Sequence, residues 1–383
     1  MKQIDIYSPV KDPTGYAWLG REIIDQLMRR HVRVNLTEFQ HWCPAEVQLK
    51  SDQHEFLGKA LENKTLPSHT PVTNLNVCLA EQTRIYDDKR NLLYTMFEVD
   101  DIPRSWVPYL HNVDEILVPT DFNRWSFTNK TGIHPDKVKV LPIGFDPERY
   151  NENNDPLPLT ANGRQVLDYP IRFLVVCEIS NRKNFWGTLH TFYKVAERVG
   201  VAKCCLVLKA GNYSKQMSLE EDVSAFKKSL VDEKTIADLP YAVFNYIPLI
   251  PEELHANFIR IGTHYLSTSL GEGWDLSAMQ AAACGLHLFV PMHSAYQCWL
   301  DQDSVTFLPV AKKMPAFQDN ATNRLYQGSN WFAFHMPDSI EIIVDNILNP
   351  VIIDKKKERL KEKITRFHWT NLMDQYMLAL HLD

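Results

Sequence analysis

Short apolar runs alternate with amphipathic stretches along almost the whole chain. Residues 4–7 alternate like a strand, and the apolar residues of 19–30 recur at helical spacing. Further short apolar runs follow at residues 32–36, 91–97, 115–119 and 137–145. Asp121 precedes a helical stretch and is a plausible N-cap. Strands that alternate with helices predict an α/β fold, with parallel sheets covered on both faces.

The alternation is interrupted once and then begins again. Residues 151–165, NENNDPLPLTANGRQ, are polar and proline-rich without periodicity, which is typical of a linker. Behind them, helical stretches, one of them a mixed acidic and basic segment between 211 and 240, separate apolar runs at 171–179, 204–210, 241–247, 263–269 and 286–290. The pattern therefore predicts two lobes. Ligands of such sheets bind at the carboxyl ends of the strands, here in the cleft between the lobes.

Length, charge and cysteine content narrow the class of protein. A chain of 383 residues favours two domains, and its net charge of −6 argues against nucleic acid as a partner. No apolar run reaches the ~18 residues that span a bilayer, and no signal segment is visible at the N-terminus. Seven cysteines without a CxxC spacing indicate reduced thiols, hence a cytoplasmic protein.

The histidines and one charged run bear on possible metal, membrane and nucleic acid binding. The fourteen histidines show no spacing of metal ligands, so no metal site is predicted. The charged run DKKKERLKEK at 354–363 favours a solvated helix face, with weak association with an anionic membrane surface, at the inner face of a membrane, or with nucleic acid as the alternative.

The stretch STSLGEGWDLSAMQAAACG, residues 267–285, indicates a ligand-binding loop. Gly271, Glu272 and Gly273 stand between a predicted strand and a helix of small residues that begins near Leu276. The unpaired amides and the positive dipole of such a helix start suit a phosphate. The glycines would let a ligand come close to the backbone. The alternative is an ordinary turn with a solvated Glu272.

The segment GEGWDLSAMQAAACG resembles the signature of glycosyltransferase family 4 and its relatives of GT-B fold. TMFEVDDIPRSW, VPTDFNRWSF, VKVLPIGFDPERY and FHWTNLMDQYMLAL are also similar to segments of that family, in order and at suitable spacing. The resemblance implies two Rossmann-like domains facing a central cleft. Residues 1–160 would bind the acceptor and 161–365 the nucleotide sugar, while a C-terminal helix in 366–383 would pack back on the first domain.

The resemblance also implies roles for individual residues. Glu272 would accept hydrogen bonds from hydroxyls of the donor sugar, and Lys183 with Arg182 would neutralise the donor phosphates. Glu98 would act near the reacting carbon or the acceptor, with a solvated acidic loop as the alternative. The remaining predicted donor contacts are Gly15, Gly273, Trp274, Asp275, Leu276 and Gln280.

Two positions depart from the family pattern. Gln280 stands where the family has its second glutamate, which would contact the ribose, and Asp275 replaces a glycine. Asp275 suits a helix N-cap, yet it brings negative charge near the expected phosphates unless it turns toward sugar hydroxyls. These changes leave room for an unusual donor or for lost catalysis.

The implied function is retaining, metal-independent transfer of a hexose from a nucleoside diphosphate sugar, with no further cofactor. The acceptor would be a hydroxyl of a glycan or glycolipid, as in the synthesis of glycolipid or cell-surface polysaccharide. Two alternatives stay open. One is transfer to a non-carbohydrate acceptor such as a modified nucleic acid base. The other is a catalytically silent module that binds nucleotide or glycan.

Overall fold

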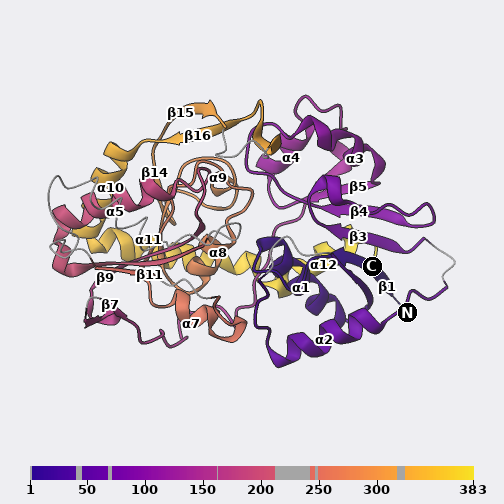
Figure 1. The fold of residues 1–383 in the computed structure, drawn as a ribbon, viewed down its shortest axis with the longest axis horizontal. Helices are drawn as coiled ribbons and strands as arrows, with labels where there is room; N and C mark the ends of the chain where they lie inside the picture. The colour runs from indigo at the N-terminus through magenta and orange to yellow at the C-terminus, as the bar shows by residue number, and fades with distance from the viewer. Residues whose placement is uncertain are drawn as a thin grey trace.

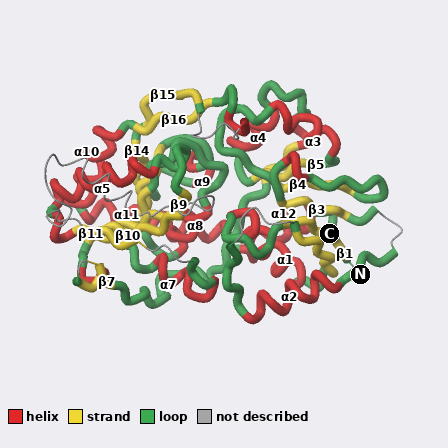
Figure 2. Tube along the Cα trace, in the orientation of Figure 1, coloured by secondary structure: helices red, strands yellow, loops and turns green. Residues whose placement is uncertain are grey.

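The computed structural model describes residues 2–39, 45–67, 71–161, 163–211, 242–245, 249–316 and 324–383. Within them the chain forms two lobes, each built on a six-stranded parallel sheet with helices packed against it (Figures 1 and 2). The predicted α/β fold with two Rossmann-like lobes is confirmed. The sheet of the first lobe ends with β6 (Val138–Val140), and that of the second begins with β9 (Ile171–Glu178).

All strand pairs of the first sheet are parallel. In sheet order the strands are β2 (Arg33–Glu38), β1 (Gln3–Ser8), β3 (Thr73–Val77), β4 (Arg90–Tyr94), β5 (Glu115–Val118) and β6. The helices of this lobe are α1 (Gly15–Arg29), α2 (Ser51–Glu62), α3 (Val107–Asn112) and α4 (Asp121–Thr128).

Two sequence predictions for this lobe are corrected by the structure. Thr120, not Asp121, caps α4, because its hydroxyl accepts a hydrogen bond from the Asn123 amide while Asp121 is already the first helical residue. The strand predicted over 91–97 ends at Tyr94, where the chain leaves the sheet toward the other lobe.

Strand β3 lies in the middle of the first sheet, although three of the five residues in its sequence TNLNV are polar, which is unusual for a buried strand. Asn74 and Asn76 are both buried. The Asn74 amide donates to the Arg84 carbonyl at 2.9 Å, and the Asn76 amide donates to the Leu92 carbonyl at 3.1 Å. Because these side chains bond to the neighbouring backbone, a polar sequence can occupy a central strand.

The second sheet is also parallel throughout. Its order is β11 (Ala242–Asn245), β10 (Cys204–Gly211), β9, β12 (His264–Leu266), β13 (His287–Pro291) and β14 (Thr306–Leu308). Its helices are α5 (Phe185–Val199), α7 (His255–Ile259), α8 (Leu276–Ala283), α9 (Tyr296–Trp299), α10 (Met336–Leu348) and α11 (Pro350–Ile364). The mixed acidic and basic helix expected between β10 and β11 lies outside the described residues.

An antiparallel hairpin of the second lobe extends to the first lobe. We call residues 310–316 and 324–334, with strands β15 (Val310–Pro315) and β16 (Asn330–Phe334), the arm. Trp331 is fully buried in the same cluster as the aromatic residues of the first lobe, and the ring of Tyr326 stacks on Phe97 with centroids 5.2 Å apart. Asp100 accepts hydrogen bonds from the Asn330 amide at 2.8 Å and from Lys313 Nζ at 2.9 Å.

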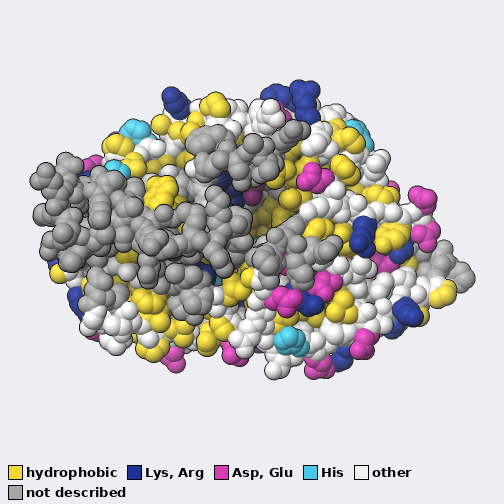
Figure 3. Space-filling view, viewed as in Figure 1, with side chains coloured by type: hydrophobic (Ala, Val, Ile, Leu, Met, Phe, Trp, Pro, Cys, Tyr) yellow, Lys and Arg dark blue, Asp and Glu magenta, His cyan; other side chains and the backbone are white. Residues whose placement is uncertain are grey.

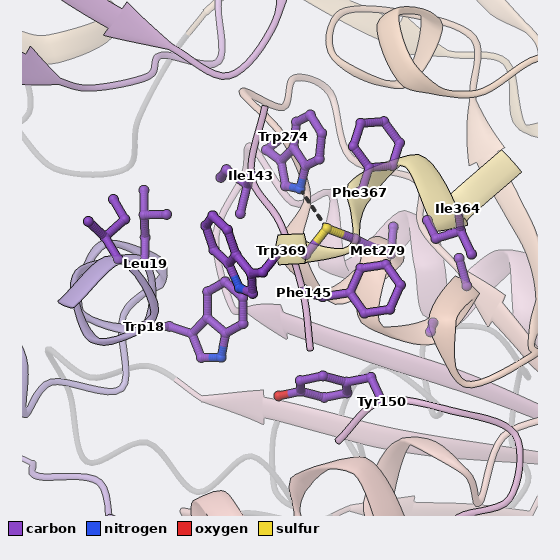
Figure 4. Packing of buried hydrophobic residues seen from close by; sticks show 14 of the residues in the cluster. Trp18, Leu19, Ile143, Phe145, Tyr150, Trp274, Met279, Ile364, Phe367 and Trp369 are labelled. Atoms are coloured by element: carbon purple, nitrogen blue, oxygen red, sulfur yellow. Dashed lines mark hydrogen bonds between the residues drawn. The ribbon is translucent and has the colours of Figure 1, made fainter. Parts of the chain in front are cut away.

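The last helix, α12 (Trp369–Ala379), crosses back to the first lobe, as the sequence predicted (Figure 1). Tyr376 donates to the Pro142 carbonyl at 3.0 Å, and Thr73 donates to the Leu380 carbonyl at 2.9 Å. Trp369 covers Gly144 so closely that an added Cβ would lie 2.6 Å from its ring. Figure 4 shows Trp369 beside Trp18 of α1 and near Trp274 and Met279 of the second lobe. The apolar core is thus continuous from one lobe to the other.

Candidate active site between the lobes

A cavity of about 580 Å³ lies between the two lobes. The first lobe lines it with the loop into α1 and the segment that follows β4, and the second lobe with the ends of β9 and β10 and the loop into α8. In Figure 3 the surface is hollowed between the lobes, and hydrophobic side chains gather there. All the site residues predicted from the sequence line this cavity: Gly15, Glu98, Arg182, Lys183, Glu272, Gly273, Trp274, Asp275, Leu276 and Gln280.

The loop that carries Arg182 and Lys183 is held against the loop that carries Glu272. The Leu270 amide donates to the Arg182 carbonyl at 2.7 Å. The Asn184 side chain donates to the Thr268 carbonyl at 3.1 Å, and Asn184 itself has a left-handed backbone with φ of +49°. These contacts fix two loops that are far apart in sequence, so that their charged side chains meet.

Glu272 is the centre of the charged cluster and is only 4% exposed. Its Oε1 lies 2.5 Å from Lys183 Nζ, and its Oε2 lies 3.2 Å from Arg182 Nη1. Burial raises the pKa of Glu272, but the two cations outweigh that effect and hold the pKa well below its usual range. Glu272 is therefore an ionised carboxylate at neutral pH, not a solvated turn residue.

Glu98 joins the same cluster from the first lobe. Its Oε1 lies 3.5 Å from Arg182 Nη2, and its Oε2 accepts a hydrogen bond from the Tyr326 hydroxyl at 3.2 Å. The structure thus places Glu98 in the cluster rather than in a solvated acidic loop. Arg182 lies between two carboxylates that come from different lobes.

Gly271 and Gly273 allow the first lobe to come close to the loop, where the sequence predicted the approach of a ligand. A Cβ on Gly271 would lie 2.1 Å from the Glu98 carbonyl oxygen, and a Cβ on Gly273 would lie 3.1 Å from Met96 Cβ. These neighbours belong to the backbone and side chains of the first lobe, not to an open ligand space. Gly15 differs, because nothing lies within 4 Å of its Cβ position. Gly271 therefore permits contact between the lobes.

Asp275 is the N-cap of α8 and turns its side chain into the protein. Its φ is +67°, and its carboxylate accepts from the Ala278 amide at 3.2 Å, which is an N-cap bond. The same carboxylate accepts from the hydroxyls of Tyr265, at 3.1 Å, and Tyr296. Burial and the charge of Glu272 raise its pKa. The inward orientation of the carboxylate and its raised pKa both reduce the repulsion that Asp275 would exert on phosphates at the start of α8.

Gln280 reaches the cavity from the second turn of α8. Its Nε2 donates to the Tyr150 hydroxyl at 3.1 Å, and that hydroxyl lies 3.2 Å from His255 Nδ1. Sequence reasoning assigned no role to Tyr150 or His255. Tyr150 stands at the end of the quoted segment VKVLPIGFDPERY, but nothing in that segment pointed to a contact with α8.

Lys209 and Glu178 were missed for a similar reason. They line the cavity where β10 and β9 end. The only signal available was their place at the carboxyl ends of predicted parallel strands, which is where the ligands of such sheets bind.

A buried ionic network connects the lobes beside the cavity. Glu252 of the second lobe pairs with Arg21 of α1 at 2.5 Å and also with Arg149. Arg149 lies 3.3 Å from Glu22, whose other oxygen accepts from the Trp369 indole at 3.0 Å. We call these five residues the ionic junction. Sequence reasoning missed it, because ion pairs between distant segments leave no local pattern.

The two carboxylates of the ionic junction differ in pKa. Burial raises the pKa of Glu22 to about 7 against the opposing charge of Arg149. Burial also acts on Glu252, but Arg21 and Arg149 outweigh it and lower the pKa to about 2. Glu252 has two guanidinium partners and Glu22 has one, which accounts for the difference.

The described part of the chain contains neither a cluster of metal ligands nor a membrane-spanning helix. There, no group of three or more His, Cys, Asp or Glu side chains could hold a metal ion. No helix among these residues is long and apolar enough to cross a membrane. In the charged run at 354–363, Lys356 donates to the Gln302 and Val305 carbonyls, and Lys363 pairs with Asp301.

Neither a model of a known protein family nor a curated protein matches this sequence. Solved structures do match. Sucrose-phosphate synthase from Thermosynechococcus elongatus has 14% identity and a TM-score of 0.65 over 100% of this chain and 99% of that chain. A glycosyltransferase from Rickettsia africae has 12% identity and a TM-score of 0.64 over 99% and 97%. Anabaena HepE in complex with UDP-glucose has 10% identity and a TM-score of 0.64 over 100% of both chains. The chain has the GT-B fold.

Proposed function

We propose that the protein is a retaining glycosyltransferase that moves a hexose from a nucleoside diphosphate sugar to a hydroxyl acceptor. The observation that carries the proposal is the ionised Glu272, bound by Lys183 and Arg182 at the start of α8 in the cavity between the lobes. Anabaena HepE, which has the same fold, was solved in complex with UDP-glucose. A nucleotide sugar has both hydroxyls and a diphosphate. Glu272 could accept hydrogen bonds from the sugar hydroxyls, while Lys183 and Arg182 could bind the phosphates.

The cations would act on the leaving group. Breaking the bond between the anomeric carbon and the phosphate oxygen leaves negative charge on the diphosphate. Lys183, Arg182 and the backbone amides of Leu276 and Ser277 at the start of α8 would stabilise that charge as it develops. Burial lowers the pKa of Lys183, but the negative charge of Glu272 outweighs burial and raises the pKa above its ordinary value. The ammonium therefore stays protonated.

The acceptor hydroxyl would attack on the face from which the diphosphate departs. Its oxygen forms the new bond to the anomeric carbon, and its proton passes to the departing phosphate oxygen, so no other base is needed. Glu98 is already bound by Arg182 and Tyr326, and we assign it to the acceptor side of the reacting carbon. Gly15, with open space around its Cα, would allow the donor phosphates close to the backbone.

The wider assignments follow the same proposal. The positive charge comes from side chains and a helix start, so we expect transfer to continue in the presence of a chelator. The acceptor would be a glycan or glycolipid, in the synthesis of glycolipid or cell-surface polysaccharide. Such acceptors suit a cytoplasmic protein that works at the inner face of a membrane.

Glu272→Gln tests the sugar end of the site. The variant keeps the shape of the side chain but loses its charge. We expect binding of the bare nucleoside diphosphate to change little, and binding or transfer of the nucleotide sugar to fall by about 1.5–3 kcal/mol, the range for hydrogen bonds to charged groups. Calorimetry with UDP and UDP-glucose measures both, with Glu362→Gln on the exposed side of α11 as the control.

The outcomes separate the candidate functions. Equal losses for the two ligands would place Glu272 at the phosphates and contradict its assignment to the sugar. If the unmodified protein binds nucleotide sugar but never turns it over with glycan or lipid acceptors, it is the silent binding module that Asp275 and Gln280 had left open.

A further inference from the structure

Gln280, Tyr150 and His255 form a hydrogen-bonded chain at the edge of the cavity. They come from α8, from the segment that follows β6, and from the first residue of α7. Tyr150 and Gln280 are 1% and 2% exposed. Gln280 and His255 line the cavity, whereas Tyr150 is not among its lining residues. Tyr150 therefore acts from behind the site.

The direction of the chain follows from the Gln280 amide, whose nitrogen donates to the Tyr150 hydroxyl. Burial lowers the pKa of His255 to about 4, so the imidazole is neutral at pH 7. Because the Tyr150 hydroxyl accepts from Gln280, its own proton is free for His255 Nδ1, 3.2 Å away, which assigns the imidazole proton to Nε2. Tyr150 has one hydroxyl proton, and donating it to His255 leaves its oxygen as an acceptor. The distance between the Gln280 nitrogen and the Tyr150 oxygen is 3.1 Å.

The orientation of the Gln280 amide decides what the cavity presents. The oxygen and nitrogen of an amide are close in size, so its orientation is set by hydrogen bonding. With the nitrogen committed to Tyr150, the carbonyl oxygen is left for a ligand. A carboxylate at this position would not need such a partner, because both its oxygens accept. Glutamine does need one.

We propose that Tyr150 is a positioning residue that fixes Gln280 with its carbonyl oxygen toward the cavity, where it accepts a hydrogen bond from a ribose hydroxyl of the donor nucleotide. The inference rests on the proposed function. Tyr150 and His255 thereby hold the neutral Gln280 amide so that it presents a hydrogen-bond acceptor to the cavity, as a glutamate would. The site then recognises a ribonucleotide without adding another negative charge beside Glu272 and Asp275.

The test compares UDP with 2′-deoxy-UDP and 3′-deoxy-UDP by calorimetry. We expect the unmodified protein to prefer UDP over the more weakly bound analogue by about 3- to 10-fold, the range for one neutral hydrogen bond. In Tyr150→Phe the amide is free to turn, and the preference should fall toward one. In Gln280→Ala it should also be lost, and adding Tyr150→Phe to that variant should change nothing more.

A rescue variant separates positioning from a general structural effect. Adding Gln280→Glu to Tyr150→Phe should restore the preference for UDP, because either carboxylate oxygen can accept. Tyr376→Phe is the matched control: it removes another buried tyrosine hydroxyl, bonded to the Pro142 carbonyl and away from the cavity, and should leave the preference unchanged.

Two results would overturn the inference while leaving the proposed function intact. One is a full preference for UDP in Tyr150→Phe, and the other is failure of Gln280→Glu to restore it. If the unmodified protein binds none of UDP, GDP and ADP, the proposed function falls and this inference falls with it.

Discussion

Two of the contacts between the lobes, the ionic junction and the arm, are built from different chemistry. At the ionic junction, Arg21, Arg149, Glu22 and Glu252 have side chains that are at most 9% exposed. At the arm, the contacts are aromatic stacking on Phe97 and a pair between Asp100 and Lys313 whose lysine side chain is 51% exposed. Lys313 keeps contact with water when its partner is lost, whereas the charged groups of the ionic junction do not, so the loss of a partner costs more at the ionic junction. We infer that the ionic junction is the pivot and the arm is the side that can separate.

The largest effect is expected from Glu252→Ala. The substitution leaves two guanidinium groups buried without their shared carboxylate, and removing one partner of a buried pair costs about 3–5 kcal/mol. Chemical unfolding followed by fluorescence measures the loss. Glu341→Ala, which removes only a surface pair with Arg198, should leave the unfolding midpoint unchanged. Similar midpoints for the two variants would contradict the view of the ionic junction as a pivot.

Glu22→Gln should change how the free energy of unfolding depends on pH. The folded pKa of about 7 lies above the ordinary value of 4.5, so the folded protein binds this proton more tightly than the unfolded chain does. The free energy of unfolding must therefore fall as pH rises from about 4.5 to about 7.

Glutamine does not titrate, so the variant should gain stability relative to the unmodified protein across that window, by up to about 3.5 kcal/mol at 1.4 kcal/mol per pKa unit. Unfolding curves at pH 5 and pH 8 measure the difference. A constant difference at the two pH values would show that Glu22 is ionised throughout.

Gly271→Ala tests whether the lobes need their close contact. The new methyl group would meet the Glu98 carbonyl oxygen, and overpacking of this kind costs about 1–3 kcal/mol if the lobes stay closed. We expect the arm side to open instead, with a larger radius of gyration in solution scattering. Gly58→Ala, in α2 with nothing within 4 Å of its Cβ position, is the matched control and should leave the radius unchanged. An unchanged radius in Gly271→Ala would count against an arm that separates.

The smallest effect is expected from Asp100→Asn at the arm. The variant keeps an acceptor for the Asn330 backbone amide, but its NH2 group can no longer accept from Lys313 Nζ or from the Asn330 side chain. The ion pair with the half-exposed Lys313 corresponds to about 0–1 kcal/mol. The hydrogen bonds and the Lys313 pair outweigh burial and lower the pKa of Asp100. The contribution of Asp100 is therefore present above about pH 4 and lost as pH falls through the folded pKa. A loss equal to that of Glu252→Ala would remove the distinction between the junctions.

Local patterns in the sequence were enough to predict the two lobes and a ligand-binding loop at Gly271–Gly273, whereas most of the predicted site residues came from the resemblance to glycosyltransferase family 4. Arg182, Lys183 and Glu272 each follow a strand of the second sheet, and parallel strands bring their carboxyl ends to one edge. The same reasoning could not find β3, because the hydrogen bonds that satisfy Asn74 and Asn76 come from other strands and loops.

Pairings between distant segments had no signal in the sequence at all. Arg21 and Glu252 are 231 residues apart, and neither stands in a recognisable motif. Gly271 did indicate that something comes close to the backbone. It could not indicate whether that neighbour is a ligand or the other lobe, since both require the same missing Cβ.

The crossing of α12 has a consequence for the order of events during synthesis. Domains generally fold as units, beginning from the N-terminus while the chain is still being made. Here the first lobe leaves the ribosome early, but Gly144 and Pro142 stay uncovered until Trp369 and Tyr376 have been translated. The second lobe must be synthesised in the meantime. Nascent first lobe therefore carries an open apolar surface through most of translation, and completion of its core coincides with docking of the two lobes.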